Sequence, residues 1–121
     1  MIEATLYSVI SSATAITALS GDRIYPVVLP TDPALPALSY MFIAGVVKPT
    51  MDTRGTQRSR VQIDCWGNTY SDAVSLREAV IQTLAGYNDG FCCQILNTLD
   101  DFEHELLQYR AVVEVYLTYS L

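Results

Sequence analysis

Cys65 has the clearest potential for nucleophilic chemistry in this sequence. It ends an alternating strand just before a glycine turn and a capped helix, in the segment RVQIDCWGNTYSDAVSLREAV at residues 60–80. Enzymes often place a nucleophile at such a corner, but a thiol also needs a general base and an orienting group. The only histidine, His104, lies between Glu103 and Glu105 in a polar stretch. Since a cysteine on the apolar face of a strand usually acts as a small hydrophobic residue, we expect Cys65 to be a core residue and His104 to be solvated.

The other candidate ligands have the wrong spacing for a metal. Cys92 and Cys93 are adjacent, so in a strand they would point to opposite faces and could not chelate. The three cysteines are odd in number and show no CxxC pair, which argues against a disulfide framework and a zinc site and favours a reducing compartment. The acidic run lacks the glycine turn and ligand spacing of a calcium loop; its members are Asp100, Asp101, Glu103 and Glu105. We therefore expect neither a metal nor a cofactor.

Length and charge restrict the class of protein further. The 121 residues fit one domain, residues 1–121, which would bury roughly two-thirds of the surface of the unfolded chain. A net charge of −6 and a sequence pI of about 4.4 argue against specific DNA binding, which depends on clustered Lys and Arg. No apolar run approaches the roughly 18 residues of a membrane span, and the N-terminus carries Glu3 where a signal peptide would be basic. Hydrophobic residues make up 50% of the chain, which suggests that other subunits cover part of its surface.

The pattern of apolar residues predicts the elements that would position these groups. A stripe with helical spacing runs from Leu6 to Leu19 and ends at Ser20-Gly21, and a proline-rich connection leads to a strand at 38–47. After a polar loop at 48–57, a strand over 58–66 alternates, and Thr69 caps a helix that ends before Gly86. The predicted elements that follow are a strand around 91–99, an acidic loop, and a last strand at 109–119. This order predicts an α+β fold, an antiparallel four- to five-stranded sheet with two helices packed on one face.

The basic and acidic residues are segregated along the chain. Four of the seven basic residues lie within a short stretch, namely Lys48, Arg54, Arg58 and Arg60, while acidic residues gather at Asp100, Asp101, Glu103 and Glu105. Two interpretations stay open. These segments are two solvated loops, or they are complementary patches through which identical subunits contact one another head to tail, which generates a ring when the arrangement closes.

Four segments of the sequence resemble a known family in their order and spacing. They are GDRIYP at 21–26, LPALSY at 35–40, the segment quoted above at 60–80, and YRAVVEVYLTY at 109–119. Together they resemble the tail completion or tail terminator proteins of long-tailed bacteriophages and prophages.

The resemblance implies a structural protein of the virion without catalytic residues. Such a protein assembles in the bacterial cytoplasm as a hexameric ring, caps the head-proximal end of the tail tube, stops tail growth and joins the tail to the head. Its implied partners are the tail tube protein and a head-closure or connector protein, and DNA passes through the ring without specific binding. No membrane is involved. Two alternatives remain, another neck component such as a head-closure or tube subunit, and a small cysteine-dependent enzyme.

Overall fold

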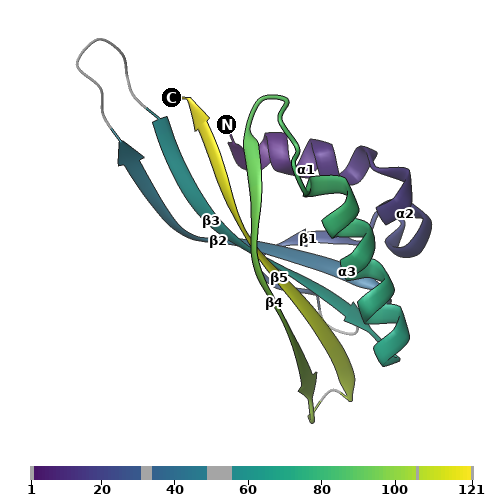
Figure 1. Cartoon of the computed structure of the whole chain (residues 1–121). Coiled ribbons are helices and arrows are strands. Elements are labelled where there is room, and N and C mark those ends of the chain that lie inside the picture. The colour runs from purple at the N-terminus through teal and green to yellow at the C-terminus, as the bar shows by residue number, and fades with distance from the viewer. Residues whose placement is uncertain (1, 31–33, 49–55, 106, 121) are drawn as a thin grey trace.

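In the part of the chain that the structure describes, residues 2–30, 34–48, 56–105 and 107–120, three helices pack against one face of a five-stranded sheet (Figure 1). The structure is a computed structural model. The helices are α1 (Ile2–Ser12), α2 (Thr14–Ser20) and α3 (Tyr70–Leu84). The strands are β1 (Ile24–Pro26), β2 (Ala37–Lys48), β3 (Thr56–Gly67), β4 (Cys92–Glu103) and β5 (Gln108–Ser120). The predicted α+β class is confirmed.

The predicted N-terminal helix is divided in two at Ala13. This residue has an extended backbone, with φ −79° and ψ 113°, and α1 and α2 meet at a bend of 78°. The break falls in the segment SSAT at residues 11–14, where hydroxyl side chains offer hydrogen bonds that compete with a helix; Ser11 Oγ donates to the Ser8 carbonyl at 3.3 Å. Because of the bend, Leu6, Ile10 and Ile16 all reach the core. We expected two helices on the sheet, and this break gives the additional one.

The strand order in the sheet is β1-β2-β3-β5-β4. Neighbouring strands pair antiparallel, as predicted, except that β1 runs parallel to β2. Since parallel strands need a connection that returns the chain to the same end of the sheet, β2 begins at the same end as β1. The predicted polar loop at 48–57 lies largely outside the described residues.

Strand β4 is longer than the sequence pattern predicts. We expected it to end at Leu99 before an acidic loop, but it continues through the acidic run in register with β5. Asp101 lies opposite Arg110 and forms an ion pair with it at 2.6 Å, and the ring centroids of Phe102 and Tyr109 are 4.8 Å apart. The prediction of a loop was wrong because these cross-strand pairs outweigh the low strand propensity of aspartate.

The face of the sheet toward the helices carries the apolar core. Val61, Ile63 and Cys65 of β3 have no exposed surface, as their alternation predicts. Strand β5 buries Ala111, Val113, Val115 and Leu117 on the same face. Helix α3 covers them with Ala73, Leu76, Val80 and Leu84.

A β-bulge interrupts the alternation of β2. The pairing with β3 shifts between Phe42 and Ala44, so Ile43 is an extra residue that has no partner of its own. Strict alternation along the strand predicts that Tyr40 and Ala44 lie on the same face. Instead Ala44 lies opposite Arg60 and is exposed, because the bulge reverses the alternation beyond this point.

Strand β4 has a second bulge. Its pairing with β5 shifts between Ile95 and Asn97, which leaves Leu96 as the extra residue. Both bulges adjoin one row of paired residues that runs across the sheet, formed by Phe42, Val61, Val115 and Ile95.

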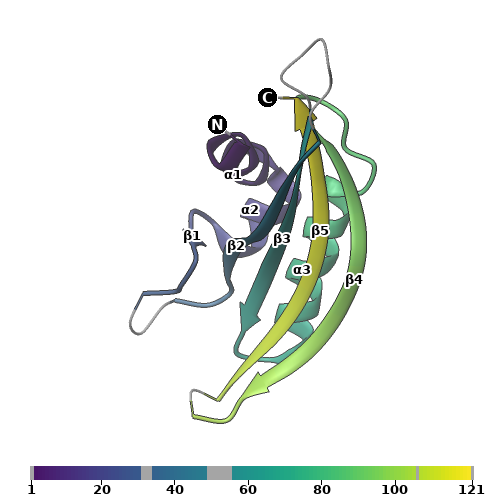
Figure 2. The same cartoon turned by 90° about the vertical axis from the view of Figure 1, so that its left-hand side faces the viewer.

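No element of the described chain covers the other side of the sheet, and Figure 2 views the molecule from that side. We call it the helix-free face; its central part consists of alternate residues of β3 from Arg58 to Trp66 and of β5 from Arg110 to Thr118. The β2–β3 end of the sheet and the β4–β5 hairpin extend in opposite directions beyond α3 (Figure 1). The described chain therefore has two different ends.

Gly67 allows β3 to turn sharply into α3. A Cβ atom at this position would lie 2.7 Å from the backbone nitrogen of Ala73 and 2.9 Å from Cβ of Asp72. The Thr69 hydroxyl then accepts a hydrogen bond from the Asp72 N–H at 3.1 Å, which is the predicted helix cap. Close backbone approach and helix capping thus account for the residues of this corner.

Gly67→Ala should lower the free energy of unfolding by about 1–3 kcal/mol, because the added methyl group pushes against backbone atoms that cannot move independently. Gly45→Ala is the matched control. There a Cβ would first meet the end of the flexible Gln57 side chain, at 2.8 Å from Nε2, and that side chain can move away. Urea unfolding of both variants checks the prediction, and equal losses would contradict it.

Candidate functional site

Cys65 is part of the core and not a reactive thiol. Its side chain has no exposed surface, and burial raises the pKa of the Cys65 thiol far above its ordinary value. A thiolate nucleophile needs the opposite, a lowered pKa and an accessible sulfur. His104 is exposed next to the β4–β5 hairpin, with its ring against the edge of Phe102 at 5.1 Å between centroids. The expectation that Cys65 is a core residue is confirmed.

The adjacent cysteines also lie as predicted. Cys92 is exposed and Cys93 is buried, because consecutive strand residues point to opposite faces. Burial raises the pKa of Cys93 to about 11. Among the described residues, no group of three or more His, Cys, Asp or Glu side chains is placed to hold a metal ion.

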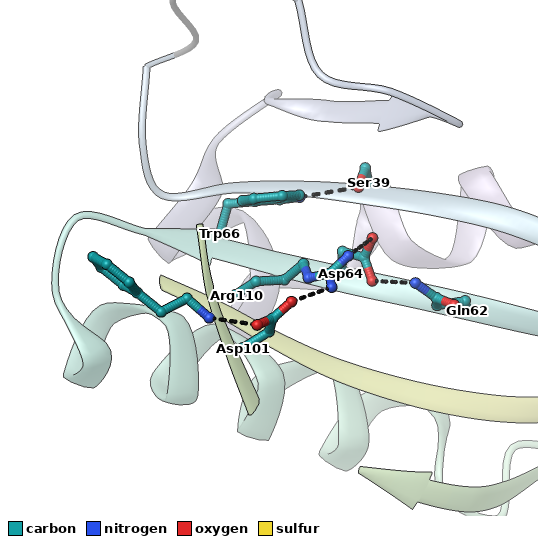
Figure 3. A network of polar contacts seen from close by, with 7 residues as sticks. Ser39, Gln62, Asp64, Trp66, Asp101 and Arg110 are labelled. Carbon is teal, nitrogen blue, oxygen red and sulfur yellow. Dashed lines mark hydrogen bonds and ion pairs between the residues drawn. The ribbon is translucent and has the colours of Figure 1, made fainter. Parts of the chain in front are cut away.

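The densest polar contacts lie on the helix-free face, around Arg110 (Figure 3). Its guanidinium forms ion pairs with Asp101 at 2.6 Å and Asp64 at 3.8 Å, and its Cζ lies 5.6 Å from the ring centroid of Trp66. Trp66 Nε1 in turn donates to Ser39 Oγ at 3.1 Å. These contacts connect β2, β3, β5 and β4, so they hold one end of the face in a defined shape.

Asp64 is the member of this network whose charged form is disfavoured by burial. Burial raises the pKa of its carboxyl group, although the hydrogen bond from Gln62 at 2.9 Å and the charge of Arg110 both act to lower it. The desolvation of the carboxylate is therefore only partly offset by its partners.

Two predicted interface arginines lie near the other end of the same face. Arg60 forms an ion pair with Glu114 in the adjacent strand, and this carboxylate raises the pKa of Arg60. The Arg58 guanidinium lies over the Tyr116 ring, 4.8 Å from its centroid. Lys48 ends β2, but its side chain lies outside the described residues, as does the whole of Arg54.

The predicted acidic patch is divided between two faces of β4. Asp100 points toward α3, where it accepts hydrogen bonds from Tyr70 Oη at 2.6 Å and from Arg77 at 2.5 Å. Asp101 points to the helix-free face and pairs with Arg110. Glu103 is half-buried at the end of β4, and Glu105 is exposed beyond it.

The pKa values of the two aspartates follow from these contacts. The hydrogen bonds from Tyr70 and Arg77 lower the pKa of Asp100. The backbone N–H of Phe102 and the side chain of Arg110 lower that of Asp101. Both carboxylates are therefore held in their charged form.

Among the described residues, the predicted basic patch and the predicted acidic patch lie apart within one chain. Arg58 lies opposite Val46 and Thr118, toward the β2–β3 end of the sheet, and Asp101 lies opposite Arg110, toward the β4–β5 hairpin. The segregation along the sequence is thus also a segregation in space. Head-to-tail pairing between subunits stays a prediction.

Sequence reasoning missed the groups that neutralise these charges inside the chain. Arg77, Arg110 and Glu114 were not singled out, because a cross-strand or helix–strand ion pair becomes visible only when the register is known. One feature of the sequence could have indicated two of them. Arg110 and Glu114 alternate with apolar residues in the last strand, which places both on its polar face.

The fold and its helix-free face, with paired charges and aromatic side chains, are suited to contacts with other proteins. The chain belongs to the family of tail completion protein gp17, whose model matches residues 4–120. It is therefore a structural component of a bacteriophage or phage-like tail. The predicted family and the predicted location in the virion are confirmed.

A solved structure with the same fold agrees with this assignment. A chain of the structure titled "Virion of native gene transfer agent (GTA) particle" matches with a TM-score of 0.73 and 14% identity, over 96% of this chain and 92% of that chain. At this identity the likeness establishes the fold. Comparison with the curated proteins gave no match.

Among the described helices, none alone is long and apolar enough to cross a membrane, although α1 and α2 together would have the length and composition as a bent pair.

In the native protein, one thiol should react with a maleimide at neutral pH, and all three should react after unfolding. The reactive thiol should be the exposed Cys92, because Cys65 and Cys93 are buried with raised pKa values. Mass spectrometry after labelling measures the number of adducts, and Cys92→Ser should remove the native adduct. Rapid native labelling of Cys65 would contradict the structure.

Asp100→Asn and Asp64→Asn should have opposite effects on stability at pH 7. The pKa of Asp100 is lowered in the folded state, so its contribution is complete above the unfolded-state pKa and is lost as the pH falls through the folded-state pKa. Replacing it should therefore lower the free energy of unfolding by about 0.2–1 kcal/mol, the range of exposed pairs. The pKa of Asp64 is raised, so its ionisation opposes folding at pH 7, and Asp64→Asn should be at least as stable as the parent.

Chemical unfolding of both variants at pH 7 and at about pH 3 checks these signs, because the loss caused by Asp100→Asn should shrink as the pH falls below the unfolded-state pKa of aspartate toward the lowered folded-state pKa of Asp100. A marked loss of stability in Asp64→Asn at pH 7 would show that the Arg110 pair outweighs the desolvation of Asp64.

Proposed function

We propose that this protein caps the head-proximal end of the tail tube as a ring, stops tail growth and joins the tail to the head. The observation that carries the proposal is the family match over residues 4–120. Contacts with other tail and head components are what a tail completion protein requires. The hexameric state, the tube protein and a head-closure or connector protein as partners belong to this proposal.

The two different ends of the subunit support a cap that has two functions. In a cyclic assembly all subunits point the same way, so one side of the ring presents the β2–β3 ends and the other presents the β4–β5 hairpins. One side can bind the tube end and block further tube subunits, while the other side stays free for the head. A symmetric pair of subunits would expose identical surfaces and could not do both.

Exposed apolar side chains support association with other subunits. Large hydrophobic residues with more than a third of their surface exposed include Val28, Met41, Ile43, Leu99 and Leu107. Scattered exposed hydrophobics are ordinary on a monomer. All of these except Val28 lie in the strands β2 and β4 or in the β4–β5 hairpin, where a neighbouring subunit could cover them.

Charge neutralisation is compatible with DNA that moves through the ring. On the helix-free face, Arg60 is paired with Glu114, and Arg110 is paired with Asp64 and Asp101. Affinity for the phosphate backbone depends on cations that are available to it. With a net charge of −6, the subunit favours passage of a duplex over its retention.

Head-to-tail charge pairing between neighbouring subunits forms part of this proposal, but with a small contribution to affinity. Arg60 and Asp101 already have partners in their own chain, so contacts across subunits would extend existing ion pairs. Solvent-exposed ion pairs contribute little to affinity. These charges would therefore set orientation more than affinity.

The two alternatives differ in how well the structure supports them. The buried Cys65 with its raised pKa disfavours a cysteine-dependent enzyme. Another neck component, such as a head-closure or tube subunit, would also form a ring. The effect of its loss on tail length distinguishes it from a terminator.

A phage or prophage that lacks this protein should produce DNA-filled heads without tails, together with free tails whose tubes exceed normal length. Both defects follow because one ring provides both the block to tube growth and the head-binding surface. Electron microscopy of lysates measures them, and purified protein added to unfinished tails of correct length should restore joining.

The control is a mutant of the tube protein, which should make filled heads but no tubes. Joined virions with tails of normal length in the absence of the protein would refute the proposed function. Tails of normal length that fail to join would instead indicate another neck component.

A further inference from the structure

Two strands of the sheet have outer edges that the described chain leaves open. Strand β1 covers β2 only where Ile24–Pro26 pairs with Leu38–Tyr40, so the edge of β2 is free beyond Tyr40. At the opposite side of the sheet, β4 is the last strand of the described chain. An open strand edge presents N–H and C=O groups that can pair with another strand.

The backbone at Val27 ends the coverage of β2 abruptly. The Val27 N–H donates to the Tyr40 carbonyl at 2.8 Å, and the Val28 N–H donates to the Pro26 carbonyl at 2.8 Å, so the chain turns away at once. Val27 has φ 66°, which is strained for a β-branched residue. Strain of this kind is retained where a function depends on the conformation, and here its effect is to expose the edge of β2.

The outward backbone groups of β4 can be assigned by alternation. Cys93 N–H points away from β5, because it donates to the Tyr87 carbonyl at 3.0 Å. Beyond the bulge, Phe102 N–H also points outward and donates to the Asp101 side chain at 2.8 Å. Since outward and inward groups alternate along an antiparallel strand, the N–H groups of Thr98 and Asp100 point outward as well.

We propose that the outer edge of β4 pairs, antiparallel, with the free edge of β2 in a second copy of this chain. The proposal rests on the ring of the proposed function and specifies its contact. Strands β2, β3, β5 and β4 alternate in direction across the sheet. Rotation about an axis along the strands preserves those directions, so β4 of one copy meets β2 of the next antiparallel, and the helices of all copies stay on the same side.

Charge favours this contact over pairing of β4 with itself. Strand β4 contains Asp100, Asp101 and Glu103 and no basic residue, whereas β2 contains no acidic residue and ends at Lys48. Two β4 strands related by a twofold axis would bring like charges together, which is unfavourable. The β4–β2 contact is head to tail, and such contacts generate rings when they close.

The position of the two open edges adds a geometric requirement. The free part of β2 lies toward the β2–β3 end of the sheet, while β4 continues to the β4–β5 hairpin at the other end (Figure 1). Extensive pairing between copies therefore requires neighbouring subunits to be staggered along the strands. Closed barrels have this stagger, because their strands tilt relative to the axis.

A proline at Thr98 tests the contact with a matched control. Proline is tolerated on an edge strand where the lost N–H faces solvent, so Thr98→Pro should fold as the parent does but be unable to donate to a neighbouring strand. Thr98→Ala loses the same side chain and keeps the N–H. We expect Thr98→Ala to cap and join unfinished tails within about twofold of the parent, and Thr98→Pro to lose more than tenfold, a difference of about 1.4 kcal/mol.

Circular dichroism and cooperative unfolding establish that both variants fold. If Thr98→Pro does not fold, amide hydrogen exchange of the parent decides the question: the Thr98 and Asp100 amides should exchange rapidly in the free subunit and become at least about tenfold slower on tails. Equal joining by both folded variants, or unchanged exchange on assembly, would overturn the β4–β2 contact while leaving the capping function intact. Failure of the parent itself to cap tails would overturn the proposed function instead.

Discussion

Strand β3 lies between β2 and β5, and its register with both neighbours determines the surface of the whole subunit. Because side chains alternate, this single register directs Val61, Ile63 and Cys65 toward the helices and Gln62 and Asp64 away from them. A shift by one residue would bury the polar set and expose the apolar set. The core, the ion pairs of the helix-free face and the position of Gly67 next to α3 all depend on this pairing.

The parts of the fold that could be predicted are those that repeat locally. Alternation over β3 and β5 and the cap at Thr69 place Cys65 in the core without knowledge of the partners. The break at Ala13 and the bulge at Ile43 could not be predicted in this way. The break depends on how α2 packs on the core, and the bulge depends on how β2 pairs with β3. The strand through Asp101 was missed for a related reason, since its stabilising partner Arg110 lies in a different strand.

The same limit applies to the candidate interaction surface. The sequence identified segregated charges, and the structure places Arg58 and Asp101 toward opposite ends of the sheet. It could not reveal that Arg60 and Asp101 each have an ion-pair partner inside the chain, because both pairs depend on the register of the strands. Arg110 lies directly opposite Asp101, whereas Glu114 lies diagonally across from Arg60. Long side chains that are paired in this way lie along the sheet and form a comparatively rigid surface, which lowers the entropic cost of binding another protein.

The two bulges adjoin the same row, which crosses the sheet from Phe42 to Ile95. A bulge bends its strand and increases the local twist, so β2 and β4 bend at the same level on the two sides of the sheet. Strands β3 and β5 lie between them and pair without a shift in register. The two outer strands can therefore curve while the hydrogen bonding at the centre of the sheet stays continuous.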